Sequence, residues 1–222
     1  SSKYNRILIV TDSVFSMDGD LAPLPDLVKI SAKYNAMLMV DEAHGTGVFG
    51  ENGRGVVEHF NLGKEVDVVM GTLSKAIGSL GGYVSSDIEL ISYLRNKARS
   101  FMYTTALPPA VCAASIAGIK LIQENPSMRV SLWHNVRFIK DKLRLLNINT
   151  ISSESQIIPI LIGDTKKAVN ISKLLYESGI LIPAIRPPTV PVNTSRLRMT
   201  VMSSHTQSDL ERLIQILSDV LD

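Results

Sequence analysis

The sequence of residues 66–82 is VDVVMGTLSKAIGSLGG. Val66–Met70 is a short run dominated by valine, which is typical of a buried strand. Three of the last five residues of the stretch are glycines, a composition typical of a tight turn. Lys75 therefore lies where a buried strand gives way to a turn. A lysine in this position is a candidate for forming a Schiff base with a carbonyl compound.

Strand-like and helix-like segments alternate around this stretch. We expect strands at Arg6–Val10, Met37–Val40 and Val66–Met70, a weaker strand at Gly82–Ser85, and helices at Asp26–Tyr34 and Ile88–Arg99. Strands that are apolar along their whole length are typical of parallel sheets covered by helices on both faces. The sequence therefore predicts an α/β core.

The pattern changes after Pro108. We expect helices at Ala110–Glu124, Met128–Leu146, Thr165–Ser178 and Ser208–Leu221, the last with Thr206 as N-cap, and strands at Ile157–Ile162, Ile180–Ile185 and Leu197–Met202. Asn125-Pro126 interrupts the first two helices, because the residue before a proline disfavours helical geometry. We therefore place a domain boundary between residues 124 and 125, with a small α+β domain at 125–222.

Composition narrows the function classes. The 222 residues are 45% apolar and 20% charged, which allows a sizeable core and excludes bulk disorder. A net charge of +2 gives no signature of nucleic-acid binding. Cys112 is the only cysteine, so it cannot form an internal disulfide, and its apolar surroundings predict a small core residue. No residue cluster predicts a metal site.

No apolar run reaches the roughly 18 residues of a membrane span, and no secretory leader is present. We therefore expect a cytoplasmic protein that does not bind membranes. The chain starts at Ser1 rather than at methionine, and its first strand begins within a few residues. Such a start is expected of a piece of a longer chain.

Asp41 and His44 follow the strand Met37–Val40 in the motif DEAHG. Ligands of open α/β sheets collect beyond the carboxyl ends of the strands, so Asp41 and Lys75 should emerge at one edge. Each alone has a plainer explanation as a turn-capping aspartate, a packed histidine or a surface lysine. DEAH also occurs in helicases, but the chain lacks their G-x-x-x-x-G-K-[ST] phosphate loop.

Together, Asp41 and Lys75 favour a cofactor that needs both an amine and an anionic partner. Pyridoxal 5'-phosphate (PLP) has these requirements, because a lysine holds its aldehyde and a carboxylate keeps its pyridine nitrogen protonated. Thr72 and Ser74 flank Lys75 and could bind the phosphate or a ring oxygen through their hydroxyls.

Three segments carry a resemblance to a known family: TDSVFSMDGD at 11–20, DEAHGTG at 41–47 and GTLSK at 71–75. In residue identity, order and spacing they resemble the α-oxoamine synthases, which are PLP-dependent enzymes related to class II aminotransferases. The resemblance implies the type I, aspartate aminotransferase-like fold. Residues 1–124 would then be the C-terminal portion of the large PLP-binding domain, and the family's N-terminal part, with its glycine-rich phosphate turn and stacking ring, would precede Ser1.

The resemblance also implies roles for individual residues. Lys75 would bind the cofactor covalently and act as a base, Asp41 would pair with the pyridinium nitrogen, and His44 would contact the phenolic oxygen. Ser16 and Thr72 match positions that contact the cofactor. Ser16 rests on the resemblance alone, because the residues themselves do not favour it over Ser13. We expect burial and the pyridinium to keep part of the Lys75 amine neutral.

The segment AIRPPTVP at 184–191 resembles the biotin-pathway branch of the family. The two prolines would hold Arg186 in place for bidentate contact with a substrate carboxylate, and Thr189 matches a substrate-contact position. An exposed arginine beside a rigid loop is the plainer explanation. Arg196 and Arg198 alternate along a strand and share one face, where a structural salt bridge is the expected role.

For this branch the implied reaction is the decarboxylative condensation of L-alanine with pimeloyl-CoA, or a pimeloyl carrier protein, to give 8-amino-7-oxononanoate. Family members are homodimers with the active site at the interface. The segment Ser100–Pro109 resembles the part that approaches the partner's cofactor, so Thr104 or Thr105 could reach a phosphate there, although a simple helix N-terminal turn also explains it.

Two alternatives remain open. One is another α-oxoamine synthase, such as the glycine-using glycine C-acetyltransferase (2-amino-3-ketobutyrate CoA ligase), against which Arg186-Pro187-Pro188 argues. The other is a non-catalytic truncated remnant, or a chain that works only with a separate N-terminal partner. Weak retention of the cofactor is expected in that case.

Overall fold

The computed structural model describes residues 5–221 of the chain. It divides into two compact units. The first consists of Ser1–Val14 and Ala22–Pro126, and the second of Phe15–Leu21 and Ser127–Asp222. The short segment 15–21 thus belongs to the second unit although it is flanked by the first, an arrangement that the sequence pattern did not predict.

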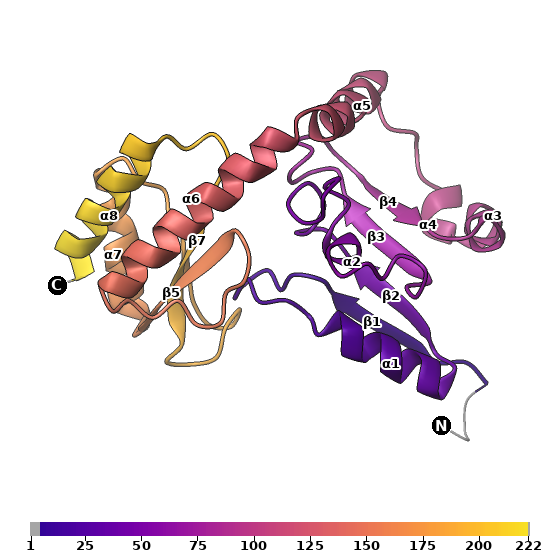
Figure 1. The fold of residues 1–222 in the computed structure, drawn as a ribbon, viewed down its shortest axis with the longest axis horizontal. Coiled ribbons are helices and arrows are strands. Elements are labelled where there is room, and N and C mark those ends of the chain that lie inside the picture. The colour runs from indigo at the N-terminus through magenta and orange to yellow at the C-terminus, as the bar shows by residue number, and fades with distance from the viewer. Residues whose placement is uncertain (1–4, 222) are drawn as a thin grey trace. The chain divides into compact units, whose positions relative to one another are not determined.

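The first unit contains a four-stranded sheet in the order β1-β2-β3-β4 (Figure 1). Its strands are β1 (Leu8–Asp12), β2 (Met37–Asp41), β3 (Val68–Thr72) and β4 (Gly82–Ser85). The first three strands are parallel, as predicted. The expectation of parallel pairing is wrong for β4, which runs antiparallel to β3. Only residues 73–81 connect them, and a parallel crossover needs a dozen residues or more.

Five helices accompany this sheet among the described residues: α1 (Leu24–Tyr34), α2 (Val56–His59), α3 (Ile88–Lys97), α4 (Arg99–Met102) and α5 (Pro109–Glu124). The core lies around β2, where Leu38 and Val40 have no exposed surface, and it includes Leu24 of α1. The prediction for Cys112 is wrong: it lies on α5, which buries only Ser115, and its side chain is exposed.

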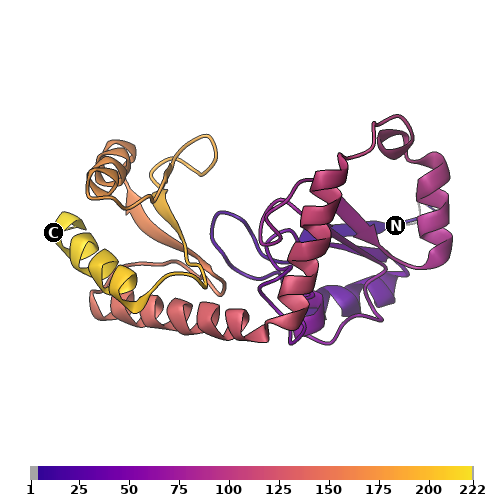
Figure 2. The same ribbon diagram turned by 90° about the horizontal axis from the view of Figure 1, so that it is seen from above.

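The second unit is a three-stranded antiparallel sheet in the order β5-β7-β6, with helices against it (Figure 2). Its strands are β5 (Ile157–Gly163), β6 (Ala184–Ile185) and β7 (Ser195–Thr200), and its helices are α6 (Pro126–Leu145), α7 (Thr165–Glu177) and α8 (Gln207–Leu221). The strand expected at Ile180–Ile185 shortens to its last two residues.

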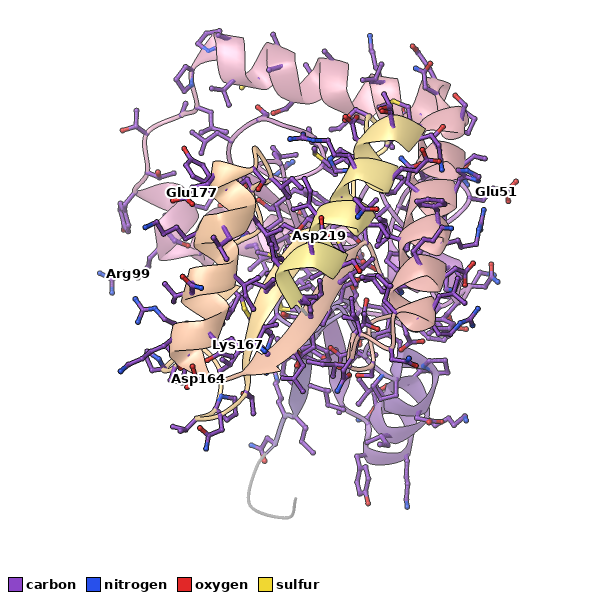
Figure 3. All side chains as sticks on the ribbon, turned by 90° about the vertical axis from the view of Figure 1, so that its left-hand side faces the viewer. Glu51, Arg99, Asp164, Lys167, Glu177 and Asp219 are labelled. Carbon is purple, nitrogen blue, oxygen red and sulfur yellow. The ribbon has the colours of Figure 1, made fainter. Side chains whose placement is uncertain are left out.

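Side chains at helix starts explain where α7 and α8 begin. Figure 3 shows Asp164 and Lys167 at the first turn of α7, where the Asp164 carboxylate accepts the Lys167 N–H at 2.7 Å. The predicted N-cap of α8 is confirmed, because Thr206 Oγ1 accepts the Asp209 N–H at 3.2 Å. Asp209 returns the contact by accepting the Thr206 N–H at 2.9 Å.

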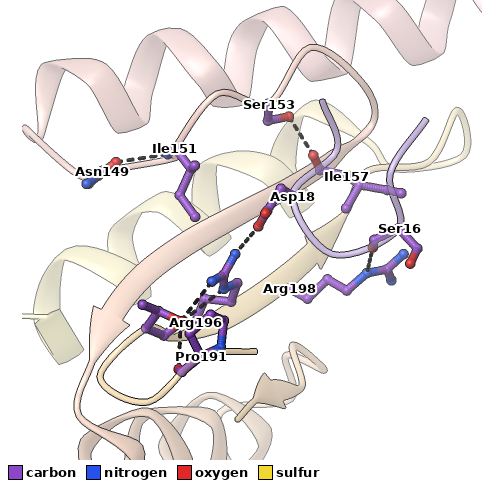
Figure 4. A network of polar contacts seen from close by, with 10 residues as sticks. Ser16, Asp18, Asn149, Ile151, Ser153, Ile157, Pro191, Arg196 and Arg198 are labelled. Atoms are coloured by element: carbon purple, nitrogen blue, oxygen red, sulfur yellow. Dashed lines mark hydrogen bonds and ion pairs between the residues drawn. The ribbon is translucent and has the colours of Figure 1, made fainter. Parts of the chain in front are cut away.

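Residues 15–21 are held on the second unit by two arginines of β7 (Figure 4). Arg196 forms an ion pair with Asp18, and its side chain is only 6% exposed. Arg198 donates from Nε to the Ser16 carbonyl oxygen at 2.6 Å. The structural salt bridge that the alternating arginines predict is thus confirmed for Arg196. Burial lowers the pKa of both guanidinium groups from the ordinary arginine value.

Within the described range, none of the helices combines the length and the apolar character that a bilayer crossing requires.

Candidate active site

The carboxyl ends of β1, β2 and β3 bring polar residues to one edge of the sheet. Asp12, Asp41 and Thr72 are the last residues of these three strands. Asp12 and Asp41 are direct partners in the parallel register, so their side chains leave the sheet on the same face. This edge is where a ligand of an open α/β sheet is expected.

The structure brings Lys75 and His44 into contact. Lys75 Nζ lies 3.0 Å from His44 Nε2, although 31 positions separate the two residues in sequence. The turns after β2 and β3 carry them, because β2 and β3 are neighbours in the sheet. The expected burial of Lys75 is wrong: its side chain is exposed, since it lies on the turn beyond the sheet edge.

Asp41 keeps one carboxylate oxygen available. Its Oδ1 accepts the Ala43 N–H at 2.8 Å, a contact that fixes the start of the turn leading to His44. Its Oδ2 accepts no hydrogen bond from any residue between 5 and 221. A protonated ring nitrogen could therefore be bound there by a charge-assisted hydrogen bond.

The hydroxyls of Thr72 and Ser74 lie 2.8 Å apart. The Thr72 hydroxyl also contacts the Gly81 carbonyl at 3.1 Å, which uses its single proton, and it accepts the Ser74 N–H at 3.2 Å. Thr72 therefore fixes the turn between β3 and β4. Ser74 is exposed and can redirect its own proton toward a ligand.

Asp12 is a candidate site residue that reasoning from the sequence did not single out from the segment 11–20. The pKa of its carboxyl is raised above the ordinary value, first by burial and then by repulsion from Asp41, while Lys75 acts in the opposite direction. No described residue donates a hydrogen bond to this carboxylate. The sequence holds a signal for it, because Asp12 lies two residues after the predicted strand Arg6–Val10, and Asp41 directly follows the predicted strand Met37–Val40.

The remaining candidates are not brought to Lys75 by any contact in the described chain. Thr104 and Thr105 are exposed in the loop between α4 and α5, where Thr104 Oγ1 lies 3.5 Å from the Thr105 carbonyl oxygen. Ser16, Arg186 and Thr189 belong to the second unit. Arg186 is exposed, and its carbonyl oxygen accepts the Thr189 N–H at 3.1 Å.

The chemistry of the assembled side chains fits PLP. The cofactor needs a lysine for its aldehyde, a carboxylate for its pyridine nitrogen, and hydroxyl or N–H donors for its phosphate. Lys75, Asp41 and Ser74 offer these groups at one sheet edge, and His44 adds a donor or acceptor beside Lys75. Among the described residues, no group of three or more His, Cys, Asp or Glu side chains is arranged to hold a metal ion.

Comparison with known proteins supports this assignment. The aminotransferase class I and II family matches residues 1–217. The 8-amino-7-oxononanoate synthase of Geobacter sulfurreducens is 48% identical over 217 residues, which are 97% of this chain and 56% of that protein. The chain thus spans about half the length of the curated relatives that it matches.

Solved structures resemble the chain in the same way. An 8-amino-7-oxononanoate synthase from Francisella tularensis superimposes with a TM-score of 0.85 at 29% identity, over 99% of this chain and 64% of that one. A serine palmitoyltransferase from S. paucimobilis, solved with PLP and myriocin bound, gives 0.91 at 32% identity, over 96% and 54%.

The fold is therefore that of the type I, aspartate aminotransferase-like PLP-dependent transferases, with part of the large domain and the small C-terminal domain. The chain belongs to the aminotransferase class I and II family. The resemblance to PLP-dependent synthases that the three motifs indicated is confirmed.

Proposed function

We propose that this chain is part of a PLP-dependent C-acyltransferase of biotin biosynthesis. It would condense L-alanine with pimeloyl-CoA or a pimeloyl carrier protein to give 8-amino-7-oxononanoate, CO2 and the free thiol carrier. One observation carries the proposal: Lys75 contacts His44 beside Asp41, at a single sheet edge, in a chain 48% identical to a synthase of this name.

Each residue has a definite task in this proposal. PLP, when bound, supplies an electron sink for the carbanion formed at Cα of alanine. Lys75 would hold the aldehyde carbon of the cofactor, and its amine would serve as the base for the Cα proton of alanine. Asp41 keeps the pyridine nitrogen protonated, and His44 binds the phenolic oxygen.

The other predicted residues complete the proposed site. Thr72 and Ser74 would contact the cofactor beside Lys75, and Ser16 would contact it from the segment that β7 holds. Arg186 would bind the carboxylate of the substrate, with Thr189 as a further contact. These roles follow from the family resemblance and from the chemistry of the side chains.

A homodimer is part of the proposal. α3 and α4 bury none of their residues. Phe101, Met102 and Tyr103 are 62%, 47% and 77% exposed. Such a contiguous apolar surface is typical of an interaction site. We propose that a second copy covers it and receives Thr104 or Thr105 at its cofactor phosphate.

The alternative is another member of the same family. Serine palmitoyltransferases resemble the chain at TM-scores above 0.9, so the fold does not determine which amino acid is used. A glycine-using synthase would share Lys75, Asp41 and His44. The two functions differ in whether L-alanine or glycine is the substrate that perturbs the bound cofactor.

The visible absorption of the chain mixed with PLP tests the function. A lysine-bound cofactor absorbs differently from free PLP, so the band should form in the wild type and disappear in Lys75→Ala. Lys64→Ala is the matched control, because Lys64 is also an exposed lysine of the first unit.

L-Alanine should shift the band at concentrations at which glycine does not. An equal or larger shift with glycine would favour the alternative. If no band forms in the wild type, the chain is an incomplete cofactor site, as expected of a remnant or of a chain that needs an N-terminal partner.

A further inference from the structure

Glu42 is a buried acidic residue directly beside Asp41 of the candidate site. It lies between Asp41 and Ala43 in the DEAH motif, and its side chain has no exposed surface. The proposed chemistry does not use it, because it cannot touch cofactor or substrate. A fully buried carboxylate is costly unless it is well hydrogen-bonded, so its partners show what it does.

Donors from separate parts of the chain converge on the Glu42 carboxylate. Oε2 accepts the Ser13 hydroxyl at 2.7 Å, just beyond the end of β1. Oε1 accepts the Val57 N–H at 2.7 Å. Glu42 thereby joins β1, the end of β2 and the start of α2. Burial raises the pKa of the Glu42 carboxyl, and the hydrogen bonds from Ser13 and Val57 oppose that rise.

The chain leaves space for this side chain by using glycine on two sides. A Cβ at Gly45 would lie 1.9 Å from Glu42 Oε2, and a Cβ at Gly55 would lie 2.4 Å from Glu42 Cδ. Neither position can carry a larger residue while the carboxylate stays in place. Gly45 is also the residue directly after His44, so the carboxylate packs against the turn that carries the imidazole.

The backbone of Glu42 fixes the same turn. Its N–H donates to the Met70 carbonyl of β3 at 2.7 Å. Its carbonyl oxygen accepts the Gly45 N–H at 3.0 Å and the Thr46 N–H at 2.8 Å. Glu42 thus closes the turn that contains His44. Its buried side chain keeps this turn from rotating.

We propose that Glu42 is a positioning residue that holds the turn 42–46 so that the Asp41 carboxylate and the His44 imidazole face Lys75. The contact between His44 and Lys75 is made by two side chains of this chain, so this part can be measured without cofactor. The effect on PLP rests on the proposed function. In metal sites, the outer partners of ligating side chains typically change affinity by about 10- to 100-fold when removed, and we expect a comparable effect here.

Glu42→Gln and Glu58→Gln form a matched pair for the test. The Glu58 carboxylate accepts the Asn52 amide at 2.6 Å, the Arg54 N–H at 3.0 Å and the Asn52 N–H at 3.2 Å. Both substitutions replace one acceptor oxygen, in a carboxyl group that binds loop donors, with an amide NH2 group. Only Glu42 adjoins Asp41 and the turn of His44.

The first measurement is the position of the His44 imidazole 15N signals, assigned with His44→Gln, in the chain without cofactor. The second is the dissociation constant of PLP. Glu42→Gln should move the His44 signals and weaken PLP binding by at least about tenfold. Glu58→Gln should leave both at the wild-type values, even where the thermal midpoints of the two variants fall by similar amounts.

Unchanged His44 signals and PLP affinity in folded Glu42→Gln would reduce Glu42 to an ordinary core residue and overturn the proposal. If Glu42→Gln does not fold, Ser13→Ala decides, because it removes one donor and leaves the charge. It should move the His44 signals in part, and wild-type signals there would likewise overturn the proposal. A wild-type chain without a Lys75-dependent band would contradict the proposed function, whereas the His44 signals would still test the role of Glu42.

Discussion

At the scale of single residues, Asp12 makes the site dependent on pH. Its folded pKa lies above the ordinary value of 3.8, because burial and Asp41 disfavour the carboxylate more than Lys75 favours it. The folded chain therefore binds the proton more tightly than the unfolded chain. The free energy of unfolding contains a contribution that falls as pH rises from 3.8 through the folded pKa.

Asp12→Asn removes this contribution. We expect the stability difference between variant and wild type to be constant below pH 3.8 and to move in favour of the variant as pH rises toward neutrality. Urea midpoints measured across this range check it. Asp26→Asn is the control, since Asp26 is a 69% exposed helix residue that pairs with Lys29. Curves for Asp12→Asn that run parallel to the wild type would contradict the prediction.

Whereas the role of His44 rested on the family resemblance, reasoning from the residues selected Lys75, Asp41 and Thr72, because the strands before them could be recognised and polar groups gather at strand ends. It did not identify Glu42, because the letters DEAH do not show that the second carboxylate turns inward to Ser13 and Val57. Such burial depends on contacts between segments distant in sequence. The exposure of Cys112 was missed for the same reason.

At the scale of elements, the segment 15–21 depends on an asymmetric ion pair. The Arg196 side chain is 6% exposed, whereas that of Asp18 is 38% exposed. Asp18→Asn leaves a guanidinium buried without its counter-charge, while Arg196→Met leaves a carboxylate that water still reaches. We expect Asp18→Asn to cost about 2–3 kcal/mol of unfolding free energy and Arg196→Met about 1 kcal/mol.

Denaturant titration of the whole chain, followed by a signal from the second unit, measures both losses of unfolding free energy. Asp141→Asn is the control: Asp141 pairs with Arg144 on the surface of α6, and the two side chains are 63% and 80% exposed. Its loss should be close to zero, since exposed pairs contribute little. A larger loss in Arg196→Met than in Asp18→Asn would show that packing of the arginine, not its charge, holds the segment.

Long periodic elements could be predicted from sequence, and short ones could not. α5, α6 and α7 lie within a few residues of their expected bounds. α2 and α4 have four residues each, too few for a helical period to be visible. β6 keeps two residues of the predicted strand, Ala184 and Ile185, which pair with β7. The direction of β4 depended on the length of a loop rather than on the composition of the strand.

At the scale of the whole molecule, the proposed homodimer explains why α4 and the loop after it expose large apolar side chains. Tyr103 is 77% exposed and lies at the end of α4, so an added charge there hardly affects folding but would disrupt an apolar interface. We expect the wild-type chain to sediment at twice its mass of 24.3 kDa, and Tyr103→Glu to shift it toward the monomer.

The matched control is Tyr176→Glu, since Tyr176 is 68% exposed on α7 of the second unit. Analytical ultracentrifugation over a concentration series should give the same dissociation constant for the control and the wild type, and a constant at least about tenfold larger for Tyr103→Glu, as expected for an aromatic side chain in an interface. A wild-type chain that is monomeric throughout, or equal effects of the two substitutions, would remove α4 from the proposed interface. PLP titrated into each sample then tests whether the cofactor band follows the dimer fraction, as it must if a threonine of one copy binds the phosphate of the other.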